Sequence, residues 1–223
     1  MQERMRKELH IQKINMAEDF SVEQLPALLD AQGIGFQRIA EVNWKDYPYC
    51  PEVQFRIAHA RTMILLHYRV KEKSVRAVAT ADNGRVWEDS CVEFFIRLSD
   101  KGDEYYNFEC NCAGKLLVEY GIPGKREHVS LQVTKDVKRW SSLGTEPFAE
   151  RVGDCSWNLA LIIPVSAFVR HRITDLSDMT FSGNFYKCGD LLDQPHFLSW
   201  SPINLAKPCF HCPQFFGKIY FEV

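Results

Sequence analysis

The sequence lacks a long hydrophobic run and an excess of charge of either sign. No apolar stretch reaches the roughly 18 residues that a membrane-spanning helix needs. Residues 1–10 are charged and carry no apolar segment typical of a secretory signal. A formal net charge of −2 gives no electrostatic reason to expect binding to nucleic acid or an anionic membrane. We therefore expect a cytoplasmic protein with neither partner, although a truncated exported protein would look the same.

The sequence also lacks the signatures of several enzyme classes and the marks of a domain boundary. It contains no G-x-S-x-G elbow, H-E-x-x-H helix, phosphate loop or dinucleotide fingerprint. Internal repeats, low-complexity tracts and linkers rich in Pro, Gly or Ser are missing too. With 46% hydrophobic residues among 223, the chain can bury a sizeable core. We predict a partly helical lead-in over residues 1–35 and one domain over residues 36–223.

Short strand-like segments separated by Gly, Pro, Asp and Asn recur from residue 36 onward. Because no long amphipathic helix lies between them, they favour an all-β fold with two antiparallel sheets packed as a sandwich. Residues 164–170 are expected to form a single helical turn. The predicted strands cover residues 53–58, 63–70, 75–80, 91–98, 105–112, 115–120, 131–133, 156–163, 179–186 and 218–223.

Eight cysteines are present, and the chain is long for a disulfide-stabilised scaffold. Reduced thiols are therefore the expected state. Cys209 and Cys212 have C-x-x-C spacing, and together with Cys110 and Cys112 they could form a zinc site. Zinc is the weaker alternative, because Cys110 and Cys112 are predicted to face the core.

The segment from Trp87 to Arg97 is the most informative part of the sequence. Side chains of a strand point alternately to its two faces. One face then holds Val92, Phe94 and Ile96 and is typical of a core. The opposite face combines an indole, carboxylates and a guanidinium, from Trp87, Asp89, Glu93 and Arg97.

Residues 105–112 repeat this alternation, and residues 99–104 suit a hairpin loop between the two segments. Asn107, Glu109 and Asn111 are then expected beside Glu93 on one polar surface. An aromatic side chain beside amides and carboxylates can stack on a sugar ring and bind its hydroxyls.

Three other interpretations use the same residues. Trp87 could pack on Arg97 or on a neighbouring loop, while Glu93 and Glu109 form surface salt bridges with Arg97 or Lys115. Glu93 and Glu109 could instead be the paired carboxylates of a glycoside hydrolase, although an open sheet face would not raise the pKa of either group. Finally, the aromatic rim could be the interface of a protein-interaction module.

Aromatic residues broken by Pro and Gly are frequent in the last 40 residues. Such segments cannot be regular strands throughout, and aromatic side chains on loops suit a binding rim. They also commonly close the open end of a sandwich core. For Trp200 both roles, ligand contact and core plug, are open.

Several separated motifs together resemble the carbohydrate-binding modules of family 9, which are related to the sugar-binding modules of xylanases. The resemblance rests most strongly on Trp-Glu-Asp-Ser-Cys-Val-Glu-Phe-Phe at residues 87–95. Further support comes from residues 43–44, 47–49, 51–53, 106–109, 184–187, 196–202 and 213–217. It implies a jelly-roll β-sandwich and a lectin-like, non-catalytic role in carbohydrate catabolism; if the chain were an enzyme, a xylanase-like hydrolase would be expected.

In this family two tryptophans enclose a sugar and polar side chains bind its hydroxyls. The resemblance implies Trp87 with Glu93 as one such pair and Trp200 as the second tryptophan. We predict a mono- or oligosaccharide ligand and no required cofactor. Family members also bind calcium, for which Asp190 and Asp193 are candidate ligands. The other predicted ligand-binding residues are Asn107, Glu109, Asn111, Asn184 and Lys187.

Overall fold

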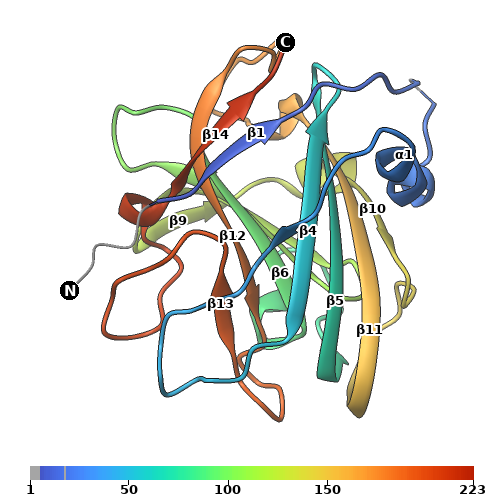
Figure 1. Cartoon of the computed structure of the whole chain (residues 1–223), viewed down its shortest axis with the longest axis vertical. Helices are drawn as coiled ribbons and strands as arrows, with labels where there is room; N and C mark the ends of the chain where they lie inside the picture. Colours follow the sequence, from blue (N-terminus) through green and yellow to red (C-terminus); the bar gives the residue numbers. More distant parts are fainter. Residues whose placement is uncertain (1–5, 18) are drawn as a thin grey trace.

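The computed structural model describes residues 6–17 and 19–223 and contains two β-sheets packed face to face (Figure 1). Residues 1–5 and 18 of the expected lead-in lie outside the described residues. The larger sheet has the order β1-β14-β12-β6-β7-β8-β9, with β13 beside β12 and β3 beside β13. The smaller sheet has the order β10-β11-β5-β4-β2. All named strand pairs are antiparallel except β1 with β14.

The larger sheet is built from nine described strands, of which β6, β7 and β12 carry the residues discussed below. Its strands are β1 Glu8–Ile11, β3 Glu41–Val42, β6 Cys91–Arg97, β7 Tyr105–Asn111, β8 Leu116–Ile122, β9 Lys125–His128, β12 Thr180–Cys188, β13 Phe197–Ser199 and β14 Gly217–Phe221. The smaller sheet contains β2 Gln37–Arg38, β4 Glu52–His59, β5 Met63–Ala77, β10 Lys138–Ser141 and β11 Phe148–Pro164.

The helical segments are short. Two α-helices, α1 Leu25–Ala31 and α2 Leu131–Asp136, accompany four 3₁₀ turns: η1 Val22–Gln24, η2 Val86–Glu88, η3 Val165–Ala167 and η4 Pro213–Phe215. In the described part of the chain, no helix has the length and apolar character needed to cross a bilayer.

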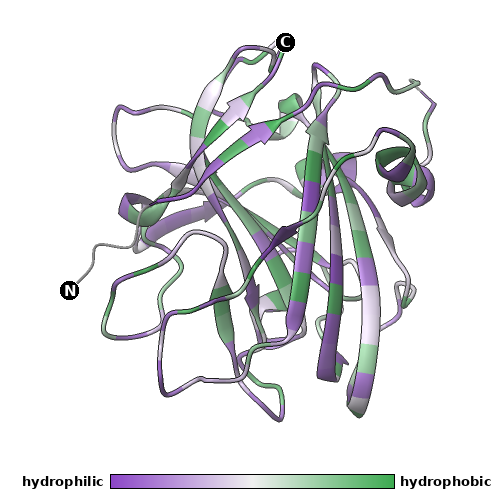
Figure 2. Cartoon of the chain, in the orientation of Figure 1, coloured by the Kyte–Doolittle hydropathy of each residue, from purple (hydrophilic) through white to green (hydrophobic). Residues whose placement is uncertain are grey.

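The main core lies between the two sheets, where apolar residues alternate along the strands (Figure 2). Phe185 of β12 stacks on Phe55 of β4, with 3.8 Å between ring centroids, and on Phe94 of β6 at 4.8 Å. These contacts join the two sheets through aromatic rings. The sequence-based prediction of a two-sheet β-sandwich is therefore confirmed.

A second hydrophobic cluster covers the outer face of the larger sheet. Phe95, Tyr105 and Tyr186 point outward from β6, β7 and β12, and residues of the C-terminal loops such as Phe210 and Phe216 pack on them. The rings of Tyr186 and Phe210 stack with centroids 4.2 Å apart. This cover makes the outer face a second interior instead of an open polar surface.

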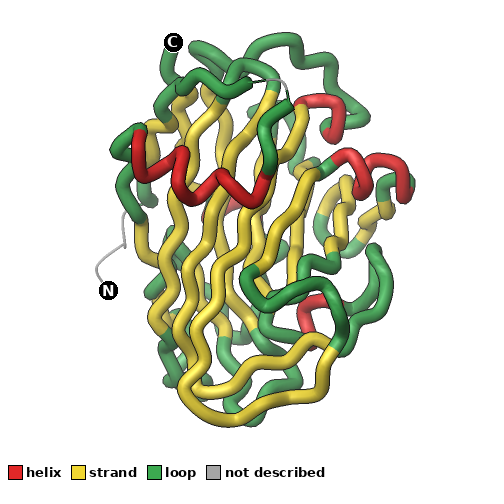
Figure 3. The backbone as a smooth tube through the Cα atoms, turned by 90° about the vertical axis from the view of Figure 1, so that its right-hand side faces the viewer, coloured by secondary structure: helices red, strands yellow, loops and turns green. Residues whose placement is uncertain are grey.

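A third cluster lies on the outer face of the smaller sheet. Leu25 and Leu29 of α1 are fully buried and pack with Leu65 of β5 and with Ala160 and Ile162 of β11. Figure 3 shows this helical segment lying across the long strands. Within the expected lead-in, α1 therefore packs against the sandwich, and β1 adds a strand to its larger sheet.

Most predicted strands are present, but three local predictions need correction. Residues 131–133 are helical, as the start of α2, and not a strand. Residues 63–70 and 75–80 are not two strands, because β5 runs continuously from Met63 to Ala77. Residues 87–89 do not belong to a strand, because η2 precedes β6. The turn expected within residues 164–170 is present as η3.

Candidate functional site

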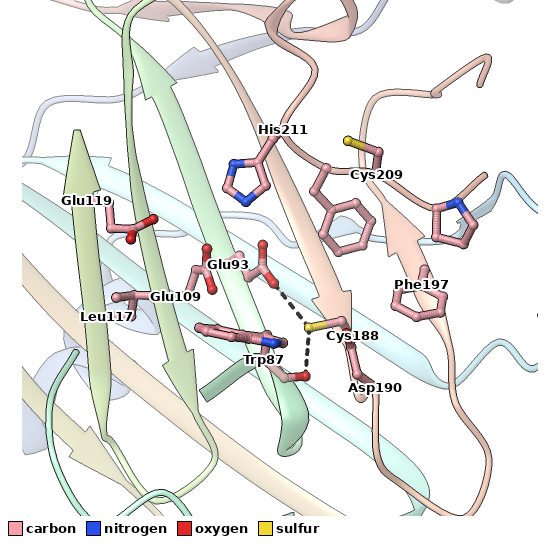
Figure 4. Close-up of a pocket in the computed structure, with 12 residues that line it drawn as sticks. Trp87, Glu93, Glu109, Leu117, Glu119, Cys188, Asp190, Phe197, Cys209 and His211 are labelled. Carbon is pink, nitrogen blue, oxygen red and sulfur yellow. Dashed lines mark hydrogen bonds between the residues drawn. The ribbon is translucent and has the colours of Figure 1, made fainter. Parts of the chain in front are cut away.

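A cavity of about 300 Å³ opens on the outer face of the larger sheet, beneath the C-terminal loops (Figure 4). Its base comes from β6, β7, β8 and β12, and the turn η2 and residues 208–211 form its sides. Its walls combine four acidic side chains with three aromatic ones. The acidic residues are Glu93, Glu109, Glu119 and Asp190, the aromatic ones are Trp87, Phe197 and Phe210, and Leu117, Cys188, Pro208, Cys209 and His211 complete the lining.

Strand register brings the two central carboxyl groups together. Glu93 of β6 lies directly opposite Glu109 of β7, and Leu117 of β8 lies opposite Glu109 on the other side. Because directly opposed residues of an antiparallel pair point to the same face, both carboxyl groups reach the cavity. The alternation of the sequence placed Glu93 and Glu109 on one face in the same way.

Both carboxyl groups are almost entirely buried, with Glu93 only 3% exposed and Glu109 4% exposed. The Cys188 thiol donates a hydrogen bond to Oε1 of Glu93 at 3.1 Å, and Nδ2 of Asn107 donates to Oε1 of Glu109 at 2.9 Å. Burial, and then the proximity of other acidic groups, raises the pKa of both side chains. The surface salt bridges considered for Glu93 and Glu109 are not formed, because both carboxyl groups are buried, and Arg97 instead bonds to Ser182 and lies 3.8 Å from Asp100.

Trp87 lies at the edge of the cavity, half-buried, in the turn η2. It packs against the outer aromatic cluster, while the Arg85 guanidinium lies 5.8 Å from its ring centroid. Of the two packing partners considered for Trp87, the neighbouring loops supply the contact and Arg85, not Arg97, is the cation near its ring. The backbone carbonyl of Trp87 accepts a hydrogen bond from the amide of Asp190, which ties the turn to the loop after β12.

The remaining polar lining has no cationic side chain among the described residues at neutral pH. Burial and, to a lesser degree, the nearby Glu88 raise the pKa of Asp190 to about 6. Burial lowers the pKa of His211 to about 4, and its Nδ1 lies 2.7 Å from the Tyr105 hydroxyl. Glu119 pairs with His128 at the rim, at 3.1 Å. The lining is thus acidic and aromatic.

Asn107 supports the cavity from beneath and is fully buried. Its amide nitrogen donates to Glu109 and, at 3.3 Å, to Glu119. Its oxygen accepts from Arg126, whose guanidinium lies over the Tyr105 ring, 3.9 Å from the centroid. Because both ends of this amide are occupied by the protein, Asn107 positions the carboxyl groups and does not line the cavity, contrary to the prediction that it binds ligand.

Two other predicted amides also have structural roles. Asn111 binds Asp89 through its amide nitrogen and accepts from the amides of Ala113 and Lys115 in the turn after β7. Asn184 of β12 exchanges hydrogen bonds with the backbone of Ser201. Both side chains are fully buried and lie outside the cavity lining, so neither is placed to bind a ligand there.

Lys187 points into the space between the sheets and not into the cavity. Its neighbours on β12, Tyr186 and Cys188, face the outer cluster, so alternation directs Lys187 inward. Its ammonium group lies 2.8 Å from Oε2 of Glu72 and 2.8 Å from Nε2 of His196, and all three side chains are fully buried. Lys187, predicted to contact a sugar, therefore lies away from the cavity, because its ion pair with Glu72 belongs to the interior.

Trp200, for which ligand contact and closing the core were both open, lies in the main core and not at the cavity. Only 2% exposed, it packs edge-on against Phe55 and Phe185 in the main core. The aromatic partners of Trp87 at the cavity are Phe197 and Phe210, which sequence reasoning did not select. The many aromatic residues of the C-terminal segment indicate a binding rim, but they do not indicate which of the rings line the cavity.

The residues predicted as candidate metal ligands lie in different parts of the fold. Asp190 lines the cavity, whereas Asp193 is exposed and its backbone amide donates to Glu150. All eight cysteines, each within the described residues, are free thiols. Cys110 and Cys112 lie in the main core, as expected, and Cys209 lines the cavity on the other side of the sheet. The proposed four-cysteine zinc site is therefore not assembled.

The fold and the cavity define a β-sandwich domain with a small, acidic and aromatic recess on the outer face of one sheet. The model of Carbohydrate-binding family 9 matches residues 23–221. Because this match covers most of the chain, the chain belongs to Carbohydrate-binding family 9, which confirms the resemblance seen in the sequence.

Solved structures agree with this assignment. A protein from Bacteroides uniformis, provisionally described as carbohydrate-binding, is 58% identical, with a TM-score of 0.95 over 98% of this chain and 100% of its own. A family 9 module from Caldicellulosiruptor kristjanssonii, solved with glucose, is 8% identical, with a TM-score of 0.59 over 97% of this chain and 96% of its own. A family 9 module from the same organism, solved with cellotriose, is 9% identical, with a TM-score of 0.58 over 97% of this chain and 94% of its own. The comparison with curated proteins gives no match.

Proposed function

We propose that this chain binds a neutral mono- or oligosaccharide, without catalysis, in the cavity beside Trp87. The observation that carries the proposal is the half-buried indole of Trp87 at the edge of a recess whose base holds Glu93 and Glu109. An apolar ring face beside a few converging polar groups suits a pyranose, which has apolar C–H faces and equatorial hydroxyls. The proposal requires no cofactor.

The protonation of the two carboxyl groups supports a neutral ligand. Because burial raises the pKa of both Glu93 and Glu109, each holds its proton more tightly than an exposed glutamate. A protonated carboxyl donates one hydrogen bond and accepts others. Sugar hydroxyls also donate and accept, so the two groups are complementary to them without any net charge.

The size of the cavity favours a single sugar unit. Small-molecule sites commonly measure about 300–1,000 Å³, and this cavity of about 300 Å³ is at the lower limit. We therefore infer that one terminal unit enters and that the rest of an oligosaccharide remains outside. The family 9 structures solved with glucose and cellotriose support this ligand class by relationship alone, because their identity to this chain is 8% and 9%.

A glycoside hydrolase is the less favoured alternative. The cavity supplies the enclosure that an open sheet face would lack, since Glu93 and Glu109 are buried. However, acid–base catalysis needs one protonated and one ionised carboxyl, and burial raises the pKa of both members of this pair. With the pKa of Glu109 raised to about 8 and that of Glu93 raised well above its usual value, neither member of the pair supplies the ionised carboxylate at neutral pH, which supports binding without hydrolysis.

A glycan array with wild type and Trp87→Ala tests the proposal. We expect wild type to bind neutral sugars and Trp87→Ala to bind them about five- to thirtyfold more weakly, equivalent to about 1–2 kcal/mol of lost ring contact. Trp140→Ala is the matched control, because Trp140 is also half-buried but packs near α1 on the smaller sheet. Equal binding by wild type and Trp87→Ala would refute this site, and release of reducing sugar would favour the hydrolase.

A further inference from the structure

Two cysteines and a glutamate converge at the base of the cavity. Cys91 of β6 and Cys188 of β12 lie directly opposite each other, and Glu93 follows two residues after Cys91 on the same face. One ligand atom from each side chain lies within 4.8 Å of the other two, and Sγ of Cys188 lies 3.1 Å from Oε1 of Glu93. Among residues 6–17 and 19–223, this is the group in which three potential metal ligands come together.

The spacing of these atoms is close to that of a metal centre. Atoms bonded to one tetrahedral zinc ion, at about 2.3 Å for sulfur and about 2.0–2.2 Å for oxygen, lie roughly 3.3–3.8 Å apart. The three ligand atoms, all within 4.8 Å of one another, would have to approach by roughly 1–1.5 Å at most to reach this spacing. They project from adjacent, paired strands, so the backbone already holds them on one face.

We propose that Cys91, Glu93 and Cys188 bind one Zn²⁺ ion, with the fourth position of the ion facing the cavity. Two sulfur ligands favour a thiophilic cation over calcium or magnesium, which prefer oxygen ligands. Three protein ligands and one open position is the arrangement of zinc sites that bind an exchangeable molecule. Glu93 and Cys188 line the cavity, so water or a ligand oxygen would occupy the open position.

Binding must displace the two thiol protons and the proton of the Glu93 carboxyl, because thiolate and carboxylate are the forms that bind metal. In the absence of metal, the Cys188 thiol donates to Glu93 and this proton holds the two side chains together. Zinc would replace that hydrogen bond with two metal bonds. The ion also offsets two of the three negative charges of the deprotonated ligands, which the buried site could not hold unpaired. The inference does not rest on sugar binding, since no sugar takes part.

The test is metal binding to the whole chain, purified under reducing conditions and stripped with chelator. Equilibrium dialysis against zinc should give one equivalent in wild type. Cobalt, used as a spectroscopic probe, should give thiolate-to-metal charge-transfer absorption. Cys91→Ala, Cys188→Ala and Glu93→Gln should each weaken zinc binding by at least about tenfold, since even second-shell changes cost that much. Proton release on zinc addition should fall in the two cysteine variants.

Two control variants keep the result interpretable. Cys110→Ala removes another fully buried thiol, from the main core, and reports any loss of binding caused by weakened packing. Cys209→Ser removes the exposed thiol of the C-x-x-C segment. Both controls should bind zinc like wild type. The proposal is overturned if wild type binds no zinc, or if binding survives in Cys188→Ala and disappears in Cys209→Ser. Either outcome leaves the glycan-array result untouched, so the two proposals fail separately.

Discussion

Trp200 provides a clear test of how the two tryptophans divide their roles. Its indole is 2% exposed and contacts Phe55 and Phe185 edge-on, so it belongs to the main core. Truncating a buried tryptophan to alanine costs about 3–5 kcal/mol, a large part of the about 5–15 kcal/mol that stabilises a typical domain. Trp200→Ala should therefore lower the free energy of unfolding by about 3–5 kcal/mol.

Trp200→Phe is the more informative variant, because it keeps one ring in the core and preserves the fold. We expect a smaller loss of stability in urea unfolding, with sugar binding per folded molecule equal to that of wild type. Trp87→Ala should give the opposite pattern, with little loss of stability and weak binding. A Trp200→Phe protein that unfolds like wild type but binds sugar weakly would show that Trp200 contacts the ligand and that our assignment is wrong.

Three further predictions concern the interior. Lys187→Met leaves the buried carboxylate of Glu72 without its ion-pair partner. The free energy of unfolding should therefore fall by about 3–5 kcal/mol, while sugar binding per folded molecule stays unchanged. Unchanged stability in urea would contradict this. Burial and Arg56 lower the pKa of His67 to about 4 from 6.5. The neutral form of His67 therefore contributes at most about 3 kcal/mol to the free energy of unfolding. This contribution is complete above pH 6.5 and is lost as pH falls toward 4, because the unfolded chain takes up the proton first. His67→Gln should flatten that part of the curve of unfolding free energy against pH, and parallel curves would refute it. A Cβ at Gly217 would lie 2.5 Å from the backbone oxygen of Lys7, so Gly217→Ala should cost about 1–3 kcal/mol, and an unchanged urea midpoint would disprove the close contact.

The parts of the fold that local patterns determine could be predicted from the sequence. Alternation along residues 91–98 and 105–112 placed Glu93 and Glu109 on one face, because the side-chain period of a strand is two. The same rule separates Asn184 from Lys187, whose positions differ by an odd number. Treating both as ligand contacts overlooked that parity, and the structure places Lys187 between the sheets.

The features of the site that could not be predicted depend on packing between segments far apart in the sequence. Nothing local indicates that residues 203–216 fold over the outer face of β6, β7 and β12 and bury the carboxyl groups expected on an open surface. The alternation continues through Trp87 and predicts a strand there, whereas Trp87 lies in the turn η2, which ends before the strand begins at Cys91. Glu119 could have been found, since it shares parity with Leu117 on the neighbouring β8.

We propose above that a sugar binds in the cavity between Trp87 and the C-terminal loops. A crystal structure with the neutral sugar selected on the glycan array would locate the ligand. We expect a pyranose ring against Trp87, with hydroxyls in hydrogen-bonding distance of Glu93 or Glu109. A sugar bound elsewhere, such as in the larger cavity of about 690 Å³ lined by Lys115 and Arg139, would contradict it.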